Sequence, residues 1–423
     1  MFRFIHAADI HLDSPLKGLE KYEGAPVDEI REATRRALEN LVALAIDRAV
    51  HFVLIAGDVY DGNWRDHNTG LFFVNQMHRL REASIPVVMI SGNHDAANRM
   101  THSLRLPDNV ERLDHAQAST SQSRRLAELG VALHGQSYAK SAVFENLAQS
   151  YPATQPGLFN IGLLHTSLDG AEGHEPYAPC TLDHLRQKEY DYWALGHVHT
   201  RRICSEEPPI VFPGNIQGRH IRESGAKGCF LVTVDDRGRC ELEFSPLDVI
   251  RWDTCVVDVS QAQRSDDVID LFSAELERLI TTHDGLPLAV RVEVTGATEV
   301  HHALLADAVQ WTNEMRGAAL AHRRTQVWIE QVKWRTSPAR KRQADLDHTG
   351  PLGTLLSYVE ELRQQEAPWT TLAGELKSLV DKLPDGLTRG DDPLRLDDPG
   401  QWRAWLDEVE ALLLSRLRDG GVA

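Results

Sequence analysis

The chain of 423 residues contains few cysteines and no long apolar run. No apolar stretch approaches the roughly 18 residues that a membrane-spanning helix requires. The opening MFRFIHAADIHLD lacks the basic and then apolar segments of a signal peptide. The cysteines form no CxxC pair, which favours reduced thiols over a disulfide framework: Cys180, Cys204, Cys229, Cys240 and Cys255. These absences predict a cytoplasmic protein without a membrane segment.

The chain also lacks an excess of basic residues. It has 45 Lys and Arg against 62 Asp and Glu, a net charge of −17. Nucleic-acid-binding proteins usually carry a basic footprint, so this composition argues against a DNA partner unless local patches or bound divalent cations reverse the field. Histidine, in contrast, is abundant at 20 residues. The apolar share of 42% is typical of a globular protein, and the length allows two or three domains.

The first 250 residues alternate short apolar runs with amphipathic segments. Five of the runs end in polar residues: FRFIHAAD, HFVLIAGD, PVVMISGN, NIGLLH and YDYWALGH. Apolar residues at helical spacing predict helices over about 28–50 and 68–83. Strand–helix–strand alternation predicts an α/β fold with a largely parallel sheet covered by helices. Ligands of such sheets gather beyond the carboxyl ends of the strands, where these polar residues lie.

Residues 251–336 repeat the alternation without polar clusters at the strand ends. The runs TCVVDVS, LPLAVRVEVTG and TQVWIEQVKW are predicted strands, and the segments between them, 266–280 and about 298–319, are predicted helices. This β-α-β-α-β order predicts a separate small α/β domain.

Residues 337–423 begin with a charged stretch, SPARKRQADLDHTGP, that is typical of a linker. Two apolar stripes at helical spacing follow, the first formed by Leu352, Leu355, Leu356, Val359 and Leu362, the second by Trp402, Trp405, Leu406, Val409, Leu412, Leu413 and Leu417. Two interpretations stay open, because such stripes either pack on each other in a small helical cap or form a seam for a partner helix.

Five clusters of potential ligands follow the strands of the first region. They contain Asp9 and His11; Asp58 and Asp61; Asn93, His94 and Asp95; His165; and His197 and His199. Each cluster alone has a structural explanation, such as a turn carboxylate or a core histidine. Together they occupy successive strand ends, and one sheet edge would bring them into a common site.

The donor types in these clusters indicate which metal ions fit. Carboxylates, imidazoles and one amide without a thiolate favour Mn²⁺, Fe or Mg²⁺ over a structural tetrahedral zinc. A shared carboxylate would give a two-metal site with ions about 3.5–4 Å apart, which activates a water towards phosphorus. We expect the glycines before Asp58, Asn93 and His197 to permit the sharp backbone exit that each ligand needs.

The motifs DxH, GDxxD, GNHD, H and GHxH, in this order, resemble those of the calcineurin-like metallophosphoesterase superfamily. The opening FRFIHAADIHLDSPL and the length resemble the SbcD branch of DNA double-strand-break nucleases, and FPGNIQGRHIRESGAKG at 212–228 resembles its YhaO subgroup. The resemblance covers residues 1 to about 245; beyond them only the domain order is similar. It implies a sandwich of mixed β-sheets flanked by helices over 1–250, a DNA-selecting α/β capping domain over 251–336, and a linker with C-terminal helices over 337–423.

The resemblance also implies a ligand set. One ion would be held by Asp9, His11, Asp58 and His199, and the other by Asp58, Asn93, His165 and His197. His94 would orient the phosphate or protonate the leaving oxygen, with the neighbouring Asp95 tuning its imidazole. Asp61 would be a second-sphere or substrate-facing group.

Basic residues near the last two motifs are candidates for phosphate contacts. Arg201, Arg202, Arg219 and His220, with Arg222, would form a local patch that faces the phosphate, although exposed surface arginines are the ordinary alternative.

Three functions follow from this reading. The first is an Mn²⁺-dependent DNA exo/endonuclease for double-strand-break repair or end processing, with an SMC-like coiled-coil ATPase of the SbcC or YhaN kind docked on the C-terminal helices. The second is a small-molecule nucleotide phosphodiesterase or phosphatase, and the third is a mainly architectural subunit. Filled ligand positions disfavour the third, and the long extension after residue 245 favours the first over the second. A homodimer is compatible with each of them.

Overall fold

The computed structural model describes most of the chain, namely residues 1–14, 32–61, 67–96, 104–168, 177–322, 325–339, 351–365, 367–380, 382–383, 394–396, 398, 400–402, 405–406, 409–410 and 413. The chain divides into two compact units. Unit 1 contains Met1–Thr254, His283–Val290 and Thr325–Glu330, and unit 2 contains Cys255–Thr282, Arg291–Arg324 and Gln331–Ala423. The predicted three-part division at 250 and 336 stays a prediction.

Unit 1 contains two six-stranded sheets. The first has the order β12-β11-β1-β2-β3-β4, with bounds Cys240–Pro246, Gly228–Val234, Phe2–Ala7, Phe52–Ala56, Val87–Ile90 and Val110–Arg112. Strands β1 to β4 are parallel, whereas β11 runs antiparallel to β1 and to β12. The sheet is therefore mixed.

The second sheet has the order β5-β6-β7-β8-β10-β9, with bounds Ser119–Thr120, Val131–Gly135, Phe159–His165, Tyr192–Gly196, Pro209–Phe212 and Arg202–Glu206. Strands β6, β7, β8 and β10 are parallel, and β5 and β9 are antiparallel edge strands. The expectation of one sheet edge is wrong in this respect, because the five motif-bearing strands divide between two sheets. Apolar residues on both faces of each strand require this second layer.

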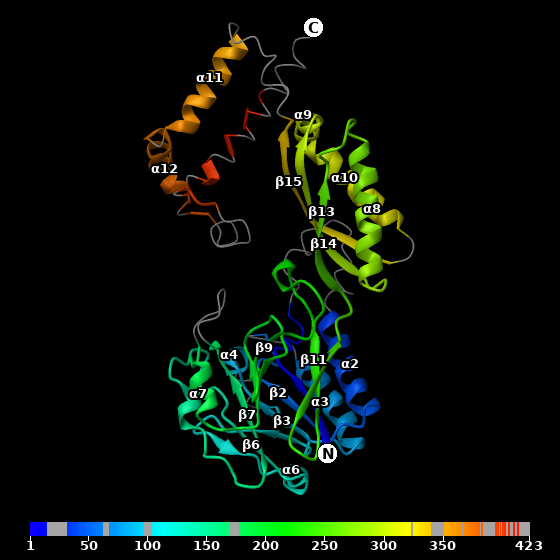
Figure 1. Ribbon diagram of the computed structural model, residues 1–423, viewed down its shortest axis with the longest axis vertical. Helices are drawn as coiled ribbons and strands as arrows, with labels where there is room; N and C mark the ends of the chain where they lie inside the picture. The colour runs from blue at the N-terminus through cyan, green and yellow to red at the C-terminus, as the bar shows by residue number, and fades with distance from the viewer. Residues whose placement is uncertain are drawn as a thin grey trace. The chain divides into compact units, whose positions relative to one another are not determined.

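Alternate residues of a strand in the first sheet face either the second sheet or the covering helices. Phe4 and Leu54 point into the core between the two sheets with Ile161 of β7, whereas Ile5 and Val53 pack against helices. These helices are α2 (Ala33–Asp47) and α3 (His67–Glu82), which lie side by side in Figure 1. Successive strand side chains alternate between faces, and central strands such as β2 and β7 are buried on both sides. The predicted sandwich of mixed sheets flanked by helices is confirmed.

The described part of unit 1 also contains short helical elements. They are α4 (Asn93–Ala96), α6 (Arg124–Glu128), η2 (Leu147–Ser150), α7 (Leu182–Arg186) and η4 (Ile221–Glu223). The helix expected over about 28–50 is described from Ala33 to Asp47, since its first predicted residues lie outside the described ranges. The helix expected over 68–83 is α3, within one residue at each end.

The small α/β arrangement expected over 251–336 is present. Strands β13 (Arg251–Asp258), β14 (Leu288–Thr298) and β15 (Val327–Pro338) form a three-stranded sheet. Helix α8 (Asp267–Thr282) follows β13, and α9 (His301–Ala306) and α10 (Ala308–Ala321) follow β14. Figure 1 shows α8 and α10 next to each other beside this sheet. Residues at every fourth position of α8 are buried, which gives the helix its apolar face: Val268, Phe272, Leu276 and Ile280.

Two C-terminal helices are described, α11 (Pro351–Gln364) and α12 (Ala367–Val380). From the second predicted stripe, Trp402 and Leu406 are buried, and the Trp402 ring stacks on Trp369 with 5.1 Å between centroids. Leu412 and Leu417 lie outside the described residues. In the described part of the chain, no helix combines the length and apolar character that crossing a bilayer requires.

Candidate metal centre

The loops after β1 and β2 continue the parallel pairing of these strands. The amide N–H of Asp9 donates to the Gly57 carbonyl (3.1 Å), and that of His11 donates to the Asp58 carbonyl (3.0 Å). Asp9, His11 and Asp58 have left-handed φ values of 51°, 44° and 52°. Such conformations cost free energy in residues other than glycine and persist where the surroundings fix them. The two loops are therefore held together by their backbones, with their ligating side chains adjacent.

Close approach, more than backbone freedom, requires glycine beside the ligands. A Cβ atom at Gly92 would lie 2.2 Å from Oδ1 of Asp58, and one at Gly196 would lie 2.0 Å from the Ala56 carbonyl oxygen. Gly57 alone among these three has a positive φ, of 94°. The expected sharp exit thus applies to Gly57, whereas the other two glycines make space for a ligand and for a backbone.

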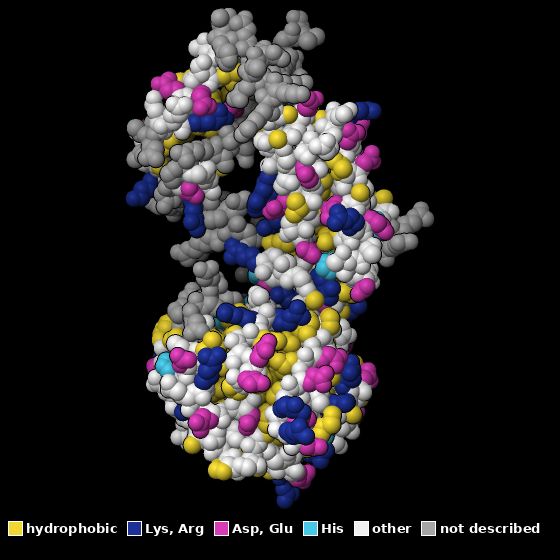
Figure 2. Space-filling model, viewed as in Figure 1, with side chains coloured by type: hydrophobic (Ala, Val, Ile, Leu, Met, Phe, Trp, Pro, Cys, Tyr) yellow, Lys and Arg dark blue, Asp and Glu magenta, His cyan; other side chains and the backbone are white. Residues whose placement is uncertain are grey.

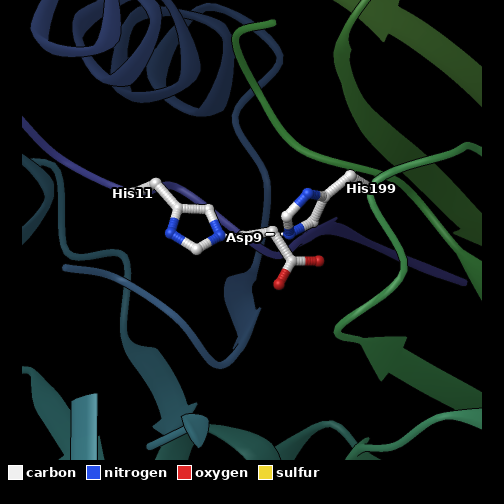
Figure 3. A group of neighbouring side chains, drawn as sticks. All are labelled: Asp9, His11 and His199. Atoms are coloured by element: carbon white, nitrogen blue, oxygen red, sulfur yellow. Dashed lines mark hydrogen bonds between the residues drawn. The ribbon is translucent and has the colours of Figure 1, made fainter. Parts of the chain in front are cut away.

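One group of ligating atoms joins Asp9, His11 and His199, which lie within 4.8 Å of one another. Figure 3 shows the two imidazole rings on either side of the Asp9 side chain. The Nε2 atoms of His11 and His199 are 3.1 Å apart. The amide N–H of His197 donates to both oxygens of Asp9 (3.1 and 3.0 Å) and so orients the carboxylate.

A second group joins Asp9, Asp58 and His165. His165 Nε2 lies 3.4 Å from Oδ2 of Asp58 and 3.0 Å from Oδ1 of Asn93. The other ring nitrogen, Nδ1, donates to the Ala56 carbonyl at 2.8 Å, so Nε2 is the atom available to a cation. The ring of His197 lies beside that of His165, with 5.1 Å between centroids. The other five predicted ligands thus lie around Asp58 and Asp9, although His197 belongs to none of the closest groups.

The electrostatics of these groups follow from burial and mutual charge. Burial disfavours the charged forms of both Asp58 and His165, but the Asp58 carboxylate raises the pKa of His165 to about 9, and His165 lowers the pKa of Asp58. Burial raises the pKa of Asp9 against the opposing effect of His199 and His165. Burial, reinforced by Arg219 and the neighbouring imidazoles, holds the pKa of His11 well below its usual range.

These observations fit bound divalent cations. His11 is fully buried, and among the described residues its Nδ1 atom makes no hydrogen bond, lying 3.8 Å from Oδ1 of Asp61. Two Nε2 atoms at 3.1 Å can share one hydrogen bond only if one of the two rings carries its proton on Nε2, and that nitrogen then has no lone pair to offer a cation. A cation held by both imidazoles and Asp9 would use both lone pairs, and His11 Nδ1–H would face Asp61. The donor set of carboxylates, imidazoles and one amide suits divalent metal ions.

His94 pairs with Asp61, not with Asp95. Its Nδ1 atom lies 2.9 Å from Oδ1 of Asp61, and its side chain is 37% exposed. Burial lowers the pKa of His94, but the hydrogen bond to Asp61 outweighs it and raises the pKa above its usual value. The Asp95 carboxylate instead accepts the backbone N–H groups of Val59, Tyr60 and Gly92. The expected contact between Asp95 and the His94 imidazole is therefore replaced by one with Asp61, since Asp95 holds two loops together.

The predicted phosphate-facing residues occupy different surroundings. Arg201 is exposed and lies over the ring of Phe244 at 3.9 Å, and Arg202 is exposed on β9. Arg219 reaches the metal centre, with Nη2 3.0 Å from Nδ1 of His199 and Nη1 4.0 Å from Oδ2 of Asp61. His220 lies 3.6 Å from Glu223. Arg219 is thus the member of this set with a direct contact to a ligand.

Sequence reasoning missed Glu223. Its carboxylate is 3% exposed and accepts a hydrogen bond from Nδ1 of His199 at 2.7 Å. Burial raises its pKa, but hydrogen bonds from His199 and Arg219 hold the pKa well below the usual range. The available sequence signals were the four-residue spacing from Arg219, typical of an ion pair, and the YhaO-like stretch that contains both residues.

Comparison with known proteins shows the family of the chain. The sequence pattern of calcineurin-like phosphoesterases matches residues 2–201, and that of "Metallophosphoesterase YhaO, middle domain" matches residues 252–337. The uncharacterized metallophosphoesterase YhaO of Bacillus subtilis (strain 168) is 37% identical over 298 residues, which cover 69% of this chain and 71% of that protein.

Two archaeal proteins named DNA double-strand break repair protein Mre11 are more distant. That of Sulfurisphaera tokodaii is 25% identical over 53% of this chain, and that of Methanopyrus kandleri is 27% identical over 61%. The matches span 58% and 59% of those two proteins. The identity and coverage shared with YhaO, together with the motifs at the five strand ends, show that the chain belongs to the calcineurin-like metallophosphoesterase family, with a middle domain of the YhaO type.

Proposed function

We propose that this metallophosphoesterase is a DNA nuclease that depends on two divalent ions, with Mn²⁺ as the first candidate and Fe or Mg²⁺ as the others. The observation that carries the proposal is the convergence of ligating side chains from five loops around Asp58, with His94 beside them. The names of the two Mre11 relatives support DNA as the substrate. The roles are double-strand-break repair or DNA end processing.

The residues divide into two ligand sets that share Asp58. Asp9, His11, Asp58 and His199 would hold one ion, and Asp58, Asn93, His165 and His197 the other. When bound, such ions lower the pKa of a coordinated water and offset negative charge on the phosphate. The backbone amide of His94 donates to Oδ1 of Asp58 at 2.9 Å, which orients the shared carboxylate. Hydrogen bonds from His197 N and to Ala56 O orient Asp9 and His165 in the same way.

His94 is the general acid of the proposal. Its Nδ1–H donates to Asp61, whose own Oδ2 accepts a hydrogen bond from Ser14 at 2.7 Å. Burial raises the pKa of Asp61, but these hydrogen bonds outweigh it and lower the pKa to about 2, so the carboxylate stays charged. This partner favours the imidazolium form and leaves Nε2 as the nitrogen that holds a proton for the leaving oxygen. His94 touches the substrate in this proposal, and Asp61 positions it.

Aromatic rings next to the centre support a substrate with nucleobases. The ring of Tyr177 lies 5.8 Å from that of His197, and the ring of Phe144 lies 5.8 Å from that of Tyr177. Phe144 is 62% exposed, and exposed aromatic rings are stacking partners for unpaired bases. Single-stranded or frayed DNA is therefore the favoured form of substrate.

The charge of the chain favours a second candidate, a phosphodiesterase or phosphatase for small nucleotides. On the face shown in Figure 2, Lys and Arg side chains are interspersed with Asp and Glu side chains, and the net charge is −17. A small nucleotide needs no extended basic track. The chemistry at the ions would be the same.

One experiment separates these candidates. The chain, loaded with Mn²⁺, is offered labelled hairpin, duplex and single-stranded DNA in parallel with mononucleotides and cyclic nucleotides. We expect cleavage of DNA, strongest where bases are unpaired, and its loss in Asp58→Asn but not in the exposed control Asp114→Asn. Cleavage of nucleotides alone would replace the nuclease by the second candidate, and hydrolysis of neither would refute both.

The proposed nuclease function includes a protein partner. An SMC-like coiled-coil ATPase would dock on the C-terminal helices, where Tyr358 on α11 and Leu379 on α12 are 56% and 55% exposed. The YhaO-type middle domain would select DNA, and a homodimer is compatible with both roles. Changing the two exposed side chains to serine should weaken binding of a purified ATPase of this class while hydrolysis by the chain alone is retained. Unchanged binding would exclude this docking site.

A further inference from the structure

The segment from Gly214 to Lys227 surrounds His199 on its ring and on its backbone. Four residues spaced four apart take part, and we name them the His199 cradle: Asn215, Arg219, Glu223 and Lys227. Each contacts His199 or the carboxylate bound to it. All four lie in the stretch 212–228 and outside the five motifs that carry the ligands.

The cradle fixes which nitrogen of the His199 ring carries the proton. Glu223 accepts from the side chain of Asn215 (2.8 Å) and from the backbone and guanidinium N–H groups of Arg219 (2.8, 3.3 and 2.8 Å). With so many donors around it, Glu223 is an acceptor only. Nη2 of Arg219 lies 3.0 Å from His199 Nδ1 but donates to Glu223 at 2.8 Å, so the shorter 2.7 Å contact of Nδ1 with Glu223 places a proton on that nitrogen. Nε2 then keeps its lone pair, and it is Nε2 that faces His11 in the metal centre.

The cradle also fixes the backbone of His199. Lys227 Nζ donates to the His199 carbonyl at 2.9 Å, and the amide N–H of Asn215 approaches the same oxygen at 3.4 Å. A Cβ atom at position 214 would lie 2.8 Å from this carbonyl oxygen, and Gly214 has a φ of 79°. The ring and the peptide of one ligand are thus held from both sides.

Burying these charges is costly unless they are paired, and a loop of this length could be closed by apolar residues instead. Glu223 is 3% exposed and Lys227 is 5% exposed. Metal-binding histidines whose second nitrogen donates to a carboxylate have a fixed ring orientation and a more basic ligating nitrogen. The polar cradle therefore matches a need of a ligand more closely than a need of the core.

We propose that Glu223, supported by Arg219, Asn215 and Lys227, is a positioning residue that holds His199 ready to bind one of the two ions. This inference rests on the proposed two-ion centre. Arg219 acts here through Glu223, which gives it a role other than the phosphate contact expected from the sequence. The ion bound by Asp9, His11, Asp58 and His199 depends on the cradle, whereas the other ion does not.

The test measures Mn²⁺ binding by titration calorimetry and equilibrium dialysis on the full chain. Glu223→Gln should weaken one of two Mn²⁺ sites by about 10–100-fold, the usual effect of losing such a partner, and leave the other unchanged. Glu223→Asp keeps the charge beside Arg219 but shortens its reach, and should weaken the same site. The matched control is Glu243→Gln, which removes the exposed ion pair of Glu243 with Arg48 at 2.9 Å.

Each outcome decides between a ligand-positioning and a merely structural role. Thermal unfolding in EDTA measures the loss of stability without ions, and a drop there with both Mn²⁺ affinities unchanged would overturn the proposal. If Glu223→Gln does not fold, Glu223→Asp and Lys227→Met carry the same comparison. Wild-type protein that binds no Mn²⁺ would refute the two-ion centre itself, which is distinguishable from a cradle without effect on a functioning centre.

Discussion

Unit 1 and the α/β part of unit 2 both place helices against a sheet, but they bury different kinds of side chain. In unit 1, the residues after β1 and β2 and at the end of β7 are charged or titratable and almost fully buried: Asp9 and Asp58 are 1% exposed, and His165 is 0% exposed. In unit 2, helix α8 buries an apolar face formed by Val268 and Phe272 with the residues one turn on. The metal-ligating groups found among the described residues all lie in unit 1.

This difference in buried side chains indicates that unit 1 carries the chemistry, whereas unit 2 has an ordinary apolar core. Burying carboxylates and imidazoles lowers the free energy of unfolding unless these groups are paired, and a core of apolar residues avoids this penalty. Unit 1 holds these groups by backbone hydrogen bonds, by left-handed loop residues and by glycines without room for a Cβ atom. Stability in unit 2 depends on apolar burial, and the chemistry of unit 1 depends on preorganised polar groups.

The largest expected effect separates chemistry from ion binding within unit 1. His94→Gln removes the proton donor but keeps the backbone amide that orients Asp58. We expect kcat to fall by about 10²–10⁴-fold, the usual contribution of a general acid, while two ions stay bound. Hydrolysis of an oligonucleotide and Mn²⁺ stoichiometry by dialysis check both expectations.

A matched control exists for this substitution. His115 forms an exposed pair with Asp114 (Nδ1–Oδ1 3.2 Å), similar in chemistry to the pair of His94 and Asp61. His115→Gln should leave kcat unchanged. Full activity of His94→Gln would remove this residue from the mechanism, and loss of an ion in the same variant would assign it to metal binding instead.

A change in the core of unit 2 tests whether the stability of this unit depends on apolar burial and is independent of metal binding. Phe272→Ala on α8 removes a fully buried ring and should destabilise this unit by about 3–5 kcal/mol. Hydrogen exchange should then quicken in α8 and β14, while Mn²⁺ affinity stays at the wild-type value. Exposed Asp270→Ala on the same helix is the control. Weakened Mn²⁺ binding in Phe272→Ala would mean that the two units do not divide stability and chemistry in this way.

Local patterns allowed much of unit 1 to be predicted from the sequence. The apolar spacing located α2 and α3, and the polar residues after the apolar runs do lie close together, although their strands belong to two sheets. The β-α-β-α-β order of residues 251–336 was equally visible, since its period changes between strand and helix spacing.

Contacts between segments that are distant in the sequence could not be predicted from local patterns. The resemblance implied a sandwich of sheets, but alternation alone does not specify which strands pair, so the place of β7 and β8 in the second sheet could not be derived from the pattern. Neighbours in sequence also misled: Asp95 adjoins His94, yet its carboxylate binds the backbone of Val59 and Tyr60. Glu223 lies 24 residues from His199 in the sequence, so its contact with His199 depends on the folded arrangement.

The smallest expected effect concerns a buried histidine of unit 1 that is not among the predicted metal ligands. The fully buried ring of His6 donates from Nε2 to the Leu195 carbonyl (3.1 Å) and accepts at Nδ1 from the Tyr192 hydroxyl (3.0 Å). Burial lowers its pKa to about 3, against the smaller opposite effect of the Leu195 carbonyl. His6 is therefore neutral in the folded state, and protonation is left to the unfolded chain.

The sign of the pH dependence follows from this difference. An unfolded histidine takes up a proton below a pH of about 6.5, but folded His6 does not until about pH 3, so its stabilising contribution is complete above pH 6.5 and is lost as the pH falls. Between pH 7 and pH 5 the loss is about 2 kcal/mol. The free energy of unfolding from hydrogen exchange of β1 amides should decline less steeply in His6→Met than in wild type, because every other titrating group is shared. Equal slopes would show that the folded protein accommodates a charged His6, which would contradict a dry core between the two sheets.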